Sequence, residues 1–405
     1  NCCIGWTAEA SSTHVQAHAL GGYAEVPLLR YNYCESLSFS FVEMVRLLLM
    51  TALGVASVQA FSGPVSLKDM NGYDLLLNAP AQRTVTAPMP ASSIYATVNK
   101  GVNGLVGMHP STHNNLKTML LPTIFPSITQ VRHDITRGSS FTPNVESLLE
   151  LNPDLVWQWG HMGEDLLTPI RAAGLKVAAL RYSTEEQTQE WISLFSLSVG
   201  DPARGKKINN WRNHVRTQLQ LQLATTPESQ RQKVMYLSRY KTGMAAAGQS
   251  GNFNSDLNIA GGRNVNDSKA DSPTINVEQI LIWDPDVIVL TNFEHDLTPE
   301  TLYKNPMLSQ LSAVRNKRVY KVPAGGYYWD PPSQDSPLYW IWLAKLMYPQ
   351  TVQFDMRHEI RSAYQMLYGF DISDSQIDQV LHVDTNQHSL NYLSTFAARK
   401  QTVAR

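Results

Sequence analysis

Cysteine is scarce in this sequence, and all of it lies near the beginning. The three cysteines are Cys2, Cys3 and Cys34, and none follows Ala60 in the 405 residues. The chain beyond Ala60 therefore offers no disulfide, no thiolate nucleophile and no cysteine ligand for a metal ion.

Neither sign of charge dominates the chain, and common catalytic motifs are missing. The 33 lysines and arginines nearly balance the 34 aspartates and glutamates, which argues against a general nucleic-acid binder with a basic face. The pair His358-Glu359 lacks the second histidine of a zinc-protease helix, and no Gly-x-Ser-x-Gly or Gly-x-x-x-x-Gly-Lys-Ser/Thr pattern is present. We therefore assign no catalytic residue.

The first sixty residues have the form of a leader rather than of a folded domain. Residues 1–43 show no helical or strand period, and we predict an upstream segment outside the fold. Residues 44–60 carry the positive Arg46, the apolar run Leu47–Val58 and a small-residue cleavage site, which together predict a secretory signal peptide. A buried N-terminal helix is the alternative. The apolar run is too short for a membrane span of about 20 residues.

One segment of the chain occurs twice without a gap. Residues Asn144–Val156 return as Asn276–Ile288, each an apolar-periodic helical stretch, a Pro-Asp pair and an apolar run. Proline cannot continue a helix interior, so each copy predicts a helix, a break and a buried strand. Helix followed by strand is half of a parallel βαβ unit, and the duplication predicts two α/β halves.

The duplicated Glu-containing helix with its Pro-Asp strand resembles the periplasmic substrate-binding proteins of ABC importers for iron-siderophores, heme or cobalamin. The resemblance covers roughly Ser66 to Pro349. It implies an α/β fold in which two Rossmann-like lobes, each with a central, mostly parallel sheet, are joined by one long helix. It also implies a monomer without enzymatic activity that lies peripheral to the inner membrane, with a small-molecule ligand and a permease dimer as partners.

A helical segment between the two copies matches the family's connector. Residues 203–224 carry a steady apolar stripe at helical spacing and would extend about 33 Å. An ordinary surface helix of one lobe is the alternative. We therefore divide the chain into an N-terminal lobe at 61–200, a linker helix at 201–224, a C-terminal lobe with capping helices at 225–386 and a loose tail at 387–405.

The start of the predicted N-terminal lobe shows strand and turn patterns. Alternation over 65–77 around Asn71-Gly72 predicts a β-hairpin. Two strands, at 84–86 and 105–107, flank a predicted helix at 92–100, and the polar, proline-punctuated stretch 108–134 is expected to be a long loop.

Candidate ligand-binding residues follow the ends of predicted strands, where open α/β sheets bind ligands. Arg137, Ser139 and Ser140 precede the first repeated helix and suit an anionic group, although a serine here or Thr142 could simply cap that helix.

Aromatic candidates occur in both halves. The tryptophans Trp157 and Trp159 form either a lobe-packing surface or the wall of a ligand site, and His161 is a weaker metal-ligand candidate. In the second half, strand ends deliver a basic and aromatic pair and an aromatic loop, namely Arg239, Tyr240, Tyr327, Tyr328 and Trp329. Three consecutive aromatics cannot all be buried by one sheet face, so we expect some to face the cleft.

Glu146 and Glu278 occupy equivalent positions in the first turns of the repeated helices. The helix dipole alone favours a glutamate there. The resemblance implies that both project from the lobes toward arginine pockets of the permease dimer.

The same candidates predict the class of ligand. Arginines beside aromatic side chains suit an anionic compound with flat parts, so we expect an iron chelate, either a ferric siderophore or heme. Molybdate or tungstate is the first alternative, cobalamin comes next, and a chelatase-like enzyme of related fold is the least favoured. No cofactor is expected. The lack of a cysteine after the leader predicts a free periplasmic protein rather than a lipoprotein.

Overall fold

The N-terminal half of the described chain forms a four-stranded parallel sheet. The computed structural model describes residues 63–398, so the predicted upstream segment, the signal peptide and all three cysteines lie outside the described residues. The strands lie in the order β4-β3-β5-β6, and their bounds are Thr84–Thr86 (β3), Leu105–Met108 (β4), Leu155–Trp159 (β5) and Val177–Leu180 (β6). Strands β3, β5 and β6 are buried throughout, as expected for a parallel sheet covered on both faces.

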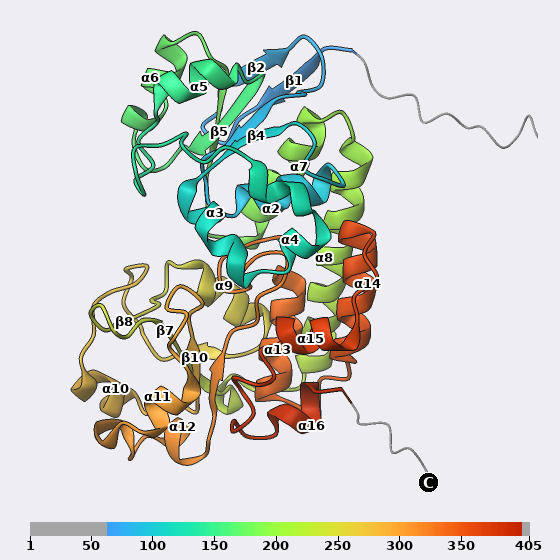
Figure 1. The fold of residues 1–405 in the computed structure, drawn as a ribbon. Coiled ribbons are helices and arrows are strands. Elements are labelled where there is room, and N and C mark those ends of the chain that lie inside the picture. Colours follow the sequence, from blue (N-terminus) through green and yellow to red (C-terminus); the bar gives the residue numbers. More distant parts are fainter. Residues whose placement is uncertain (1–62, 399–405) are drawn as a thin grey trace, which may run out of the picture. The chain divides into compact units, whose positions relative to one another are not determined.

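Helices and a hairpin surround this sheet (Figure 1). The antiparallel hairpin consists of β1 (Val65–Lys68) and β2 (Asp74–Leu77), as the sequence predicted. The helices are α2 (Ala91–Val98), α3 (Pro110–Asn115), α4 (Leu121–Ile124), α5 (Val145–Leu151), α6 (Thr168–Ala172) and α7 (Glu185–Ser198). The expectation of a long loop over 108–134 is wrong, because α3, α4 and two short 3₁₀ turns occupy it. Prolines begin α3 and the second 3₁₀ turn, and one lies in the first turn of α4, where a missing N–H costs nothing.

The C-terminal half forms a second, separate sheet. Its main path is β11-β10-β7-β8, with β9 also paired to β7, and every pairing except β7 with β8 is parallel. The strands are β7 (Lys233–Arg239), β8 (Ala245–Ala246), β9 (Arg263–Asn264), β10 (Val287–Leu290) and β11 (Val319–Lys321). The helices are α9 (Asn252–Ile259), α10 (Val277–Trp283), α11 (Pro299–Tyr303), α12 (Ser312–Arg315), α13 (Ser336–Met347), α14 (Met356–Tyr368), α15 (Asp374–Val380) and α16 (Tyr392–Phe396).

The two copies of the repeat build the same local structure in different sheets. Each helix ends in a left-handed residue, Asn152 in the first copy and Asp284 in the second. The aspartate of each Pro-Asp pair then accepts backbone N–H bonds at the start of the neighbouring strand. Asp154 accepts from Arg83 at 2.9 Å, and Asp286 accepts from Lys233 at 2.8 Å. The motif therefore fixes the turn and the strand alignment by the same contacts in both halves.

Helix α8 (Pro202–Leu223) connects the two halves. Its first turn is capped by Asp201, whose carboxylate accepts the Arg204 N–H at 3.0 Å. The helix packs on α7 of the N-terminal half and on α9 and α13 of the C-terminal half (Figure 1). The described residues all belong to one compact unit, and their fold is the α/β arrangement of two sheets and one long connecting helix that the sequence predicted.

A buried ion pair fixes α8 where the halves meet. The fully buried Arg212 of α8 binds both carboxylate oxygens of Glu185, the first residue of α7. Its remaining nitrogen donates to the Ser333 carbonyl at 2.8 Å, in the loop before α13. An arginine presents five N–H donors in a planar fork, so one side chain can hold three elements together.

The end of the chain is ordered against the second half, so the expectation of a loose tail after residue 387 is wrong for the described part. Tyr392 and Phe396 of α16 are 0% and 1% exposed. The Tyr392 hydroxyl accepts from the Trp342 indole N–H at 3.0 Å. Two aromatic side chains in an otherwise polar segment supply the apolar area that docks it.

Candidate functional site

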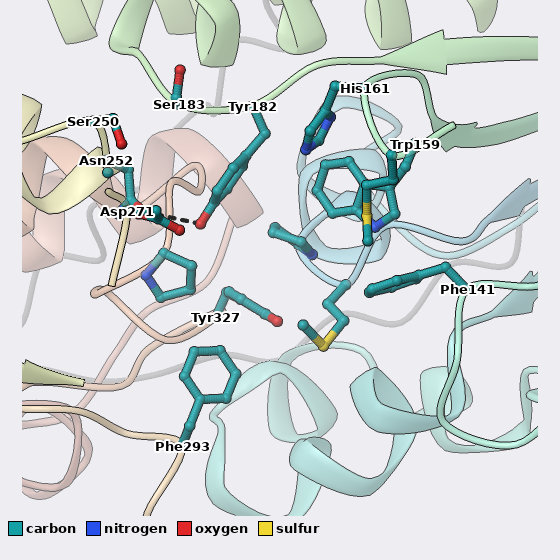
Figure 2. Close-up of a pocket in the computed structure, with 15 residues that line it drawn as sticks. Phe141, Trp159, His161, Tyr182, Ser183, Ser250, Asn252, Asp271, Phe293 and Tyr327 are labelled. Carbon is teal, nitrogen blue, oxygen red and sulfur yellow. Dashed lines mark hydrogen bonds between the residues drawn. The ribbon is translucent and has the colours of Figure 1, made fainter. Parts of the chain in front are cut away.

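A cavity of about 380 Å³ lies between the two halves. Its walls come from segments that follow strands β3, β5 and β6 of the first sheet and β10 and β11 of the second, together with the beginning of α9. The lining residues are Met89, Pro90, Phe141, Trp159, His161, Met162, Tyr182, Ser183, Ser250, Gly251, Asn252, Asp271, Phe293, Tyr327 and Pro331 (Figure 2). The carboxyl ends of parallel strands are the usual place for a ligand in open α/β sheets.

The wall from the N-terminal half is a cluster of aromatic rings centred on Trp159. The centroid of Trp159 lies 5.8 Å from that of Phe141, 5.2 Å from that of His161 and 5.6 Å from that of Tyr182. All three rings meet Trp159 edge to face, which is a favoured arrangement for aromatic pairs. The cluster is a broad apolar surface at the end of β5 and β6.

Phe141 reaches this cluster because buried polar side chains hold its loop. Gln158 of β5 donates its amide N–H to the Phe141 carbonyl at 3.0 Å. The ring of His109 is bonded to the Ser140 carbonyl at 3.1 Å and packs on Phe141 with centroids 4.7 Å apart. Burial lowers the pKa of His109, so this histidine is neutral at pH 7.

The wall from the C-terminal half is ordered by the buried carboxylate of Asp330. This carboxylate accepts the Tyr236 hydroxyl of β7 at 2.7 Å and the Asn292 backbone N–H at 2.9 Å. The Asn252 amide donates to the Asp330 carbonyl at 2.8 Å. One aspartate therefore ties the ends of β7 and β10 and the start of α9 to the loop that carries Tyr327.

The two walls are bonded to each other at several points. The Tyr182 hydroxyl donates to the Asn252 side chain at 3.1 Å across the cavity (Figure 2). Deeper in the structure, the Leu120 N–H donates to the Gly325 carbonyl at 2.9 Å. The halves are thus held by direct hydrogen bonds as well as by α8.

The cavity carries little charge. Of the described residues that line it, Asp271 is the one carboxylate, and none is an arginine or a lysine. The Tyr327 hydroxyl points into the cavity (Figure 2), and burial raises the pKa of this tyrosine well above its usual value. Tyr327 is therefore a neutral phenol at pH 7. The cavity suits a ligand with large apolar or aromatic surfaces and no strong negative charge.

Three of the residues singled out from the sequence line the cavity: Trp159, His161 and Tyr327. The others lie elsewhere. Arg137, Ser139 and Ser140 are exposed on the loop before α5, and the Ser140 hydroxyl donates to the Arg137 carbonyl at 2.7 Å. Arg239 is exposed, and the Tyr240 hydroxyl accepts the Asn305 amide at 2.7 Å.

The loop of three aromatics agrees with the expectation in one respect, because Tyr327 lines the cavity. Tyr327, Tyr328 and Trp329 are nevertheless all 1% exposed or less. The loop leaves the sheet face, and packing from several elements covers it. The hydroxyl of Tyr328, for example, is bonded to that of Thr118 in the other half at 2.8 Å. Trp157 is likewise buried, against Phe195.

The cap of α5 also differs from the expectation that a serine or Thr142 caps this helix. The residue before the helix is Asn144, whose side chain makes no cap bond, so neither a serine nor Thr142 caps it. Glu146 and Glu278 are exposed in the first turns of α5 and α10.

Sequence reasoning missed most of the cavity wall. Tyr182 and Phe293 lie two and three residues after β6 and β10, so the rule that ligands bind at strand ends could have found them. Phe141, Asn252 and Asp271 lie in loops or at a helix start, and nothing in their local sequence marks them.

Within residues 63–398, no group of three or more His, Cys, Asp or Glu side chains is arranged to hold a metal ion. No helix in this range is long and apolar enough to cross a bilayer.

Comparisons with known proteins agree with the fold. Residues 103–325 match the family described as periplasmic binding protein. The molybdate-binding protein MolA of Haemophilus influenzae is 21% identical over 258 residues, which are 57% of this chain and 71% of that protein. The vitamin B12-binding protein of Vibrio cholerae is 26% identical over 188 residues, 45% of this chain and 64% of that protein. The crystal structure of a periplasmic solute binding protein from Veillonella parvula superposes with a TM-score of 0.73 at 26% identity, covering 80% of this chain and 99% of the other.

Proposed function

The chain belongs to the periplasmic binding protein family, of the ABC transporter type, and we propose that it captures a bulky metal chelate that is uncharged or cationic. A ferric siderophore of the hydroxamate kind is the first choice, and cobalamin is the second. The protein then acts as a binding protein and not as an enzyme. It works in the periplasm, which it reaches through the signal peptide expected at 44–60.

The cavity wall is the observation that carries this proposal. Phe141, Trp159, Tyr182, Phe293 and Tyr327 surround it with aromatic surface, and it has the volume for a ligand of many atoms. A chelate wraps its metal ion in organic ligand atoms and presents a largely apolar exterior. Such a surface can pack on aromatic side chains without any protein group reaching the metal.

Heme and the oxyanions are less well supported by the same wall. The propionates of heme and the charge of molybdate call for arginine or lysine partners, and the described cavity wall has neither. An axial tyrosinate would require Tyr327 to lose its proton, which its burial opposes. Arg137, on which the oxyanion alternative depended, lies outside the cavity.

The remaining part of the proposal concerns delivery. Glu146 and Glu278 stand exposed at equivalent places on the two halves, which suits a partner that offers the same basic site twice. We propose that both glutamates dock on the permease dimer of an ABC transporter. The binding protein acts as a monomer in this complex.

Calorimetric titration of the purified protein tests the ligand class. The probes are ferrioxamine B, cyanocobalamin, hemin and molybdate, each added to ligand-free protein at pH 7. We expect heat of binding with ferrioxamine B or cyanocobalamin and none with molybdate. Binding of molybdate or hemin alone would overturn the proposal.

A further inference from the structure

Two buried hydrogen-bond donors in the cavity wall have no partner among the described residues. They are the Tyr327 hydroxyl and the Trp159 indole N–H. Tyr327 is 1% exposed and Trp159 is 5% exposed, so bulk water has little access to either side chain as a hydrogen-bond partner. A buried polar group without a partner destabilises the fold, and nearly all such groups in folded proteins are satisfied.

Other side chains near the cavity show that the wall can satisfy its polar groups. The Tyr182 hydroxyl, in the same wall, is bonded to Asn252, and the hydroxyl of Tyr328, next in sequence to Tyr327, is bonded to Thr118. Trp191, which packs on Trp159, donates to the Arg181 carbonyl at 2.6 Å. Buried donors without a partner also occur away from the cavity, at Trp157 and Trp329 for example, but among the described lining residues they are Tyr327 and Trp159.

The chemistry of the two groups restricts what can complete them. An indole N–H can only donate, so its partner must be an acceptor. A tyrosine carries its proton at neutral pH, and burial raises the pKa of Tyr327 further, so this hydroxyl too is available as a donor. A neutral donor favours an uncharged oxygen, such as an amide or hydroxamate carbonyl, without paying the desolvation of a full anion.

One polar group of the cavity wall has the reverse polarity. Asp271 lines the cavity, and its carboxylate lies close to Gly251, just before α9. A carboxylate only accepts hydrogen bonds, so it suits an N–H group or a cation of the ligand.

We propose that the ligand exposes carbonyl-type oxygens to Tyr327 and Trp159 and an N–H group or a cation to Asp271. This inference rests on the proposed function and deepens it, because it names the outward-facing groups of the chelate. Tyr327 and Trp159 then determine specificity through hydrogen bonds and do not coordinate the metal.

Matched variants test the role of the two donors. Tyr327→Phe and Trp159→Phe each remove one donor and keep an aromatic ring. The controls are the sequence neighbours Tyr328→Phe and Trp157→Phe, because neither Tyr328 nor Trp157 lines the cavity. Calorimetry with ferrioxamine B and cyanocobalamin gives the affinity, and thermal unfolding of the ligand-free proteins gives Tm.

The cavity variants and the control Tyr328→Phe should differ in opposite ways in ligand affinity and in Tm. Tyr327→Phe should weaken binding by about 3- to 10-fold, the value of one neutral hydrogen bond. Trp159→Phe should weaken binding at least as much, because it also shortens the apolar wall. Tyr327→Phe should leave the Tm of the ligand-free protein unchanged or higher, since it removes an unsatisfied group. Tyr328→Phe should do the opposite, lowering Tm through loss of the Thr118 bond while the affinity stays within 2-fold. A purely structural role for Tyr327 would lower Tm as well.

The outcomes separate this inference from the function on which it rests. If the unaltered protein binds neither chelate, the proposed function fails. If it binds one of them and Tyr327→Phe and Trp159→Phe bind it as tightly as the two controls, the function stands and the donor role is refuted. A loss of Tm in Tyr327→Phe equal to that in Tyr328→Phe would also refute it.

Discussion

Replacement of the buried Asp256 by asparagine should change how the stability of this protein depends on pH. Asp256 lies on α9, one turn after Asn252, and is 5% exposed. One carboxylate oxygen accepts the Trp340 indole N–H at 2.6 Å, whereas the other has no partner among the described residues. Burial first, and then the nearby Glu185 carboxylate, raise the pKa of Asp256 to about 7 against the opposing charge of Arg212.

The sign follows from proton linkage. The unfolded carboxyl has a pKa of about 4, so between pH 4 and pH 7 the folded protein binds more protons than the unfolded chain. The contribution of Asp256 to the free energy of unfolding therefore falls as pH rises through this window, and the loss is complete above pH 7. A shift of about three pKa units corresponds to about 4 kcal/mol.

The variant Asp256→Asn keeps an oxygen for Trp340 and cannot ionise. Relative to the unaltered protein, its Tm should be higher by only about 3 °C at pH 5, where about 1.4 kcal/mol of the stability is lost, and by more at pH 8. At about 2 °C for each kcal/mol in a chain of this size, the gain in Tm at pH 8 should be about 8 °C. The difference between the two proteins is the quantity to measure, because other carboxyls titrate equally in both.

Differential scanning calorimetry from pH 5 to pH 8 gives this difference directly. The exposed Asp384 supplies the control, since Asp384→Asn makes the same chemical change on the protein surface. A flat difference for Asp256→Asn, or one that shrinks as pH rises, would show that the buried carboxyl is not protonated near neutral pH in the folded protein.

Three further predictions concern docking, the connection between the halves and the cavity. Glu146→Lys and Glu278→Lys should each abolish import in cells while the calorimetric affinity for the ligand stays unchanged; normal import by both variants would contradict the docking role. Arg212→Leu leaves Glu185 buried without its partner, so the free energy of unfolding in urea should fall by about 3–5 kcal/mol, and a loss under 1 kcal/mol would contradict this. Phe293 is 45% exposed, so Phe293→Ala should weaken binding of the chelate with little change in Tm, and an equal affinity would remove it from the site.

Local sequence patterns were enough to predict the architecture of this protein. The structure of the repeated segment could be predicted from about a dozen residues, because proline ends the helix and the apolar run requires a sheet that is covered on both faces. The apolar stripe of the connecting helix likewise repeats every three or four residues. In the structure, Asp154 and Asp286 make the same backbone contacts in the two halves, so a duplicated sequence was a reliable sign of a duplicated fold.

The cavity wall was decided by contacts between residues far apart in the chain. Asp330 orients the loop of Tyr327 through the hydroxyl of Tyr236, which is 94 residues away in sequence. The sequence placed Arg137 just before the first repeated helix, but it could not show that the side chain stays outside the cavity. Strand ends bring many loops to one edge of a sheet, and only the packed loops determine which side chains face the ligand. Burial also raises the pKa of Tyr327, and this effect depends on packing that the sequence does not show.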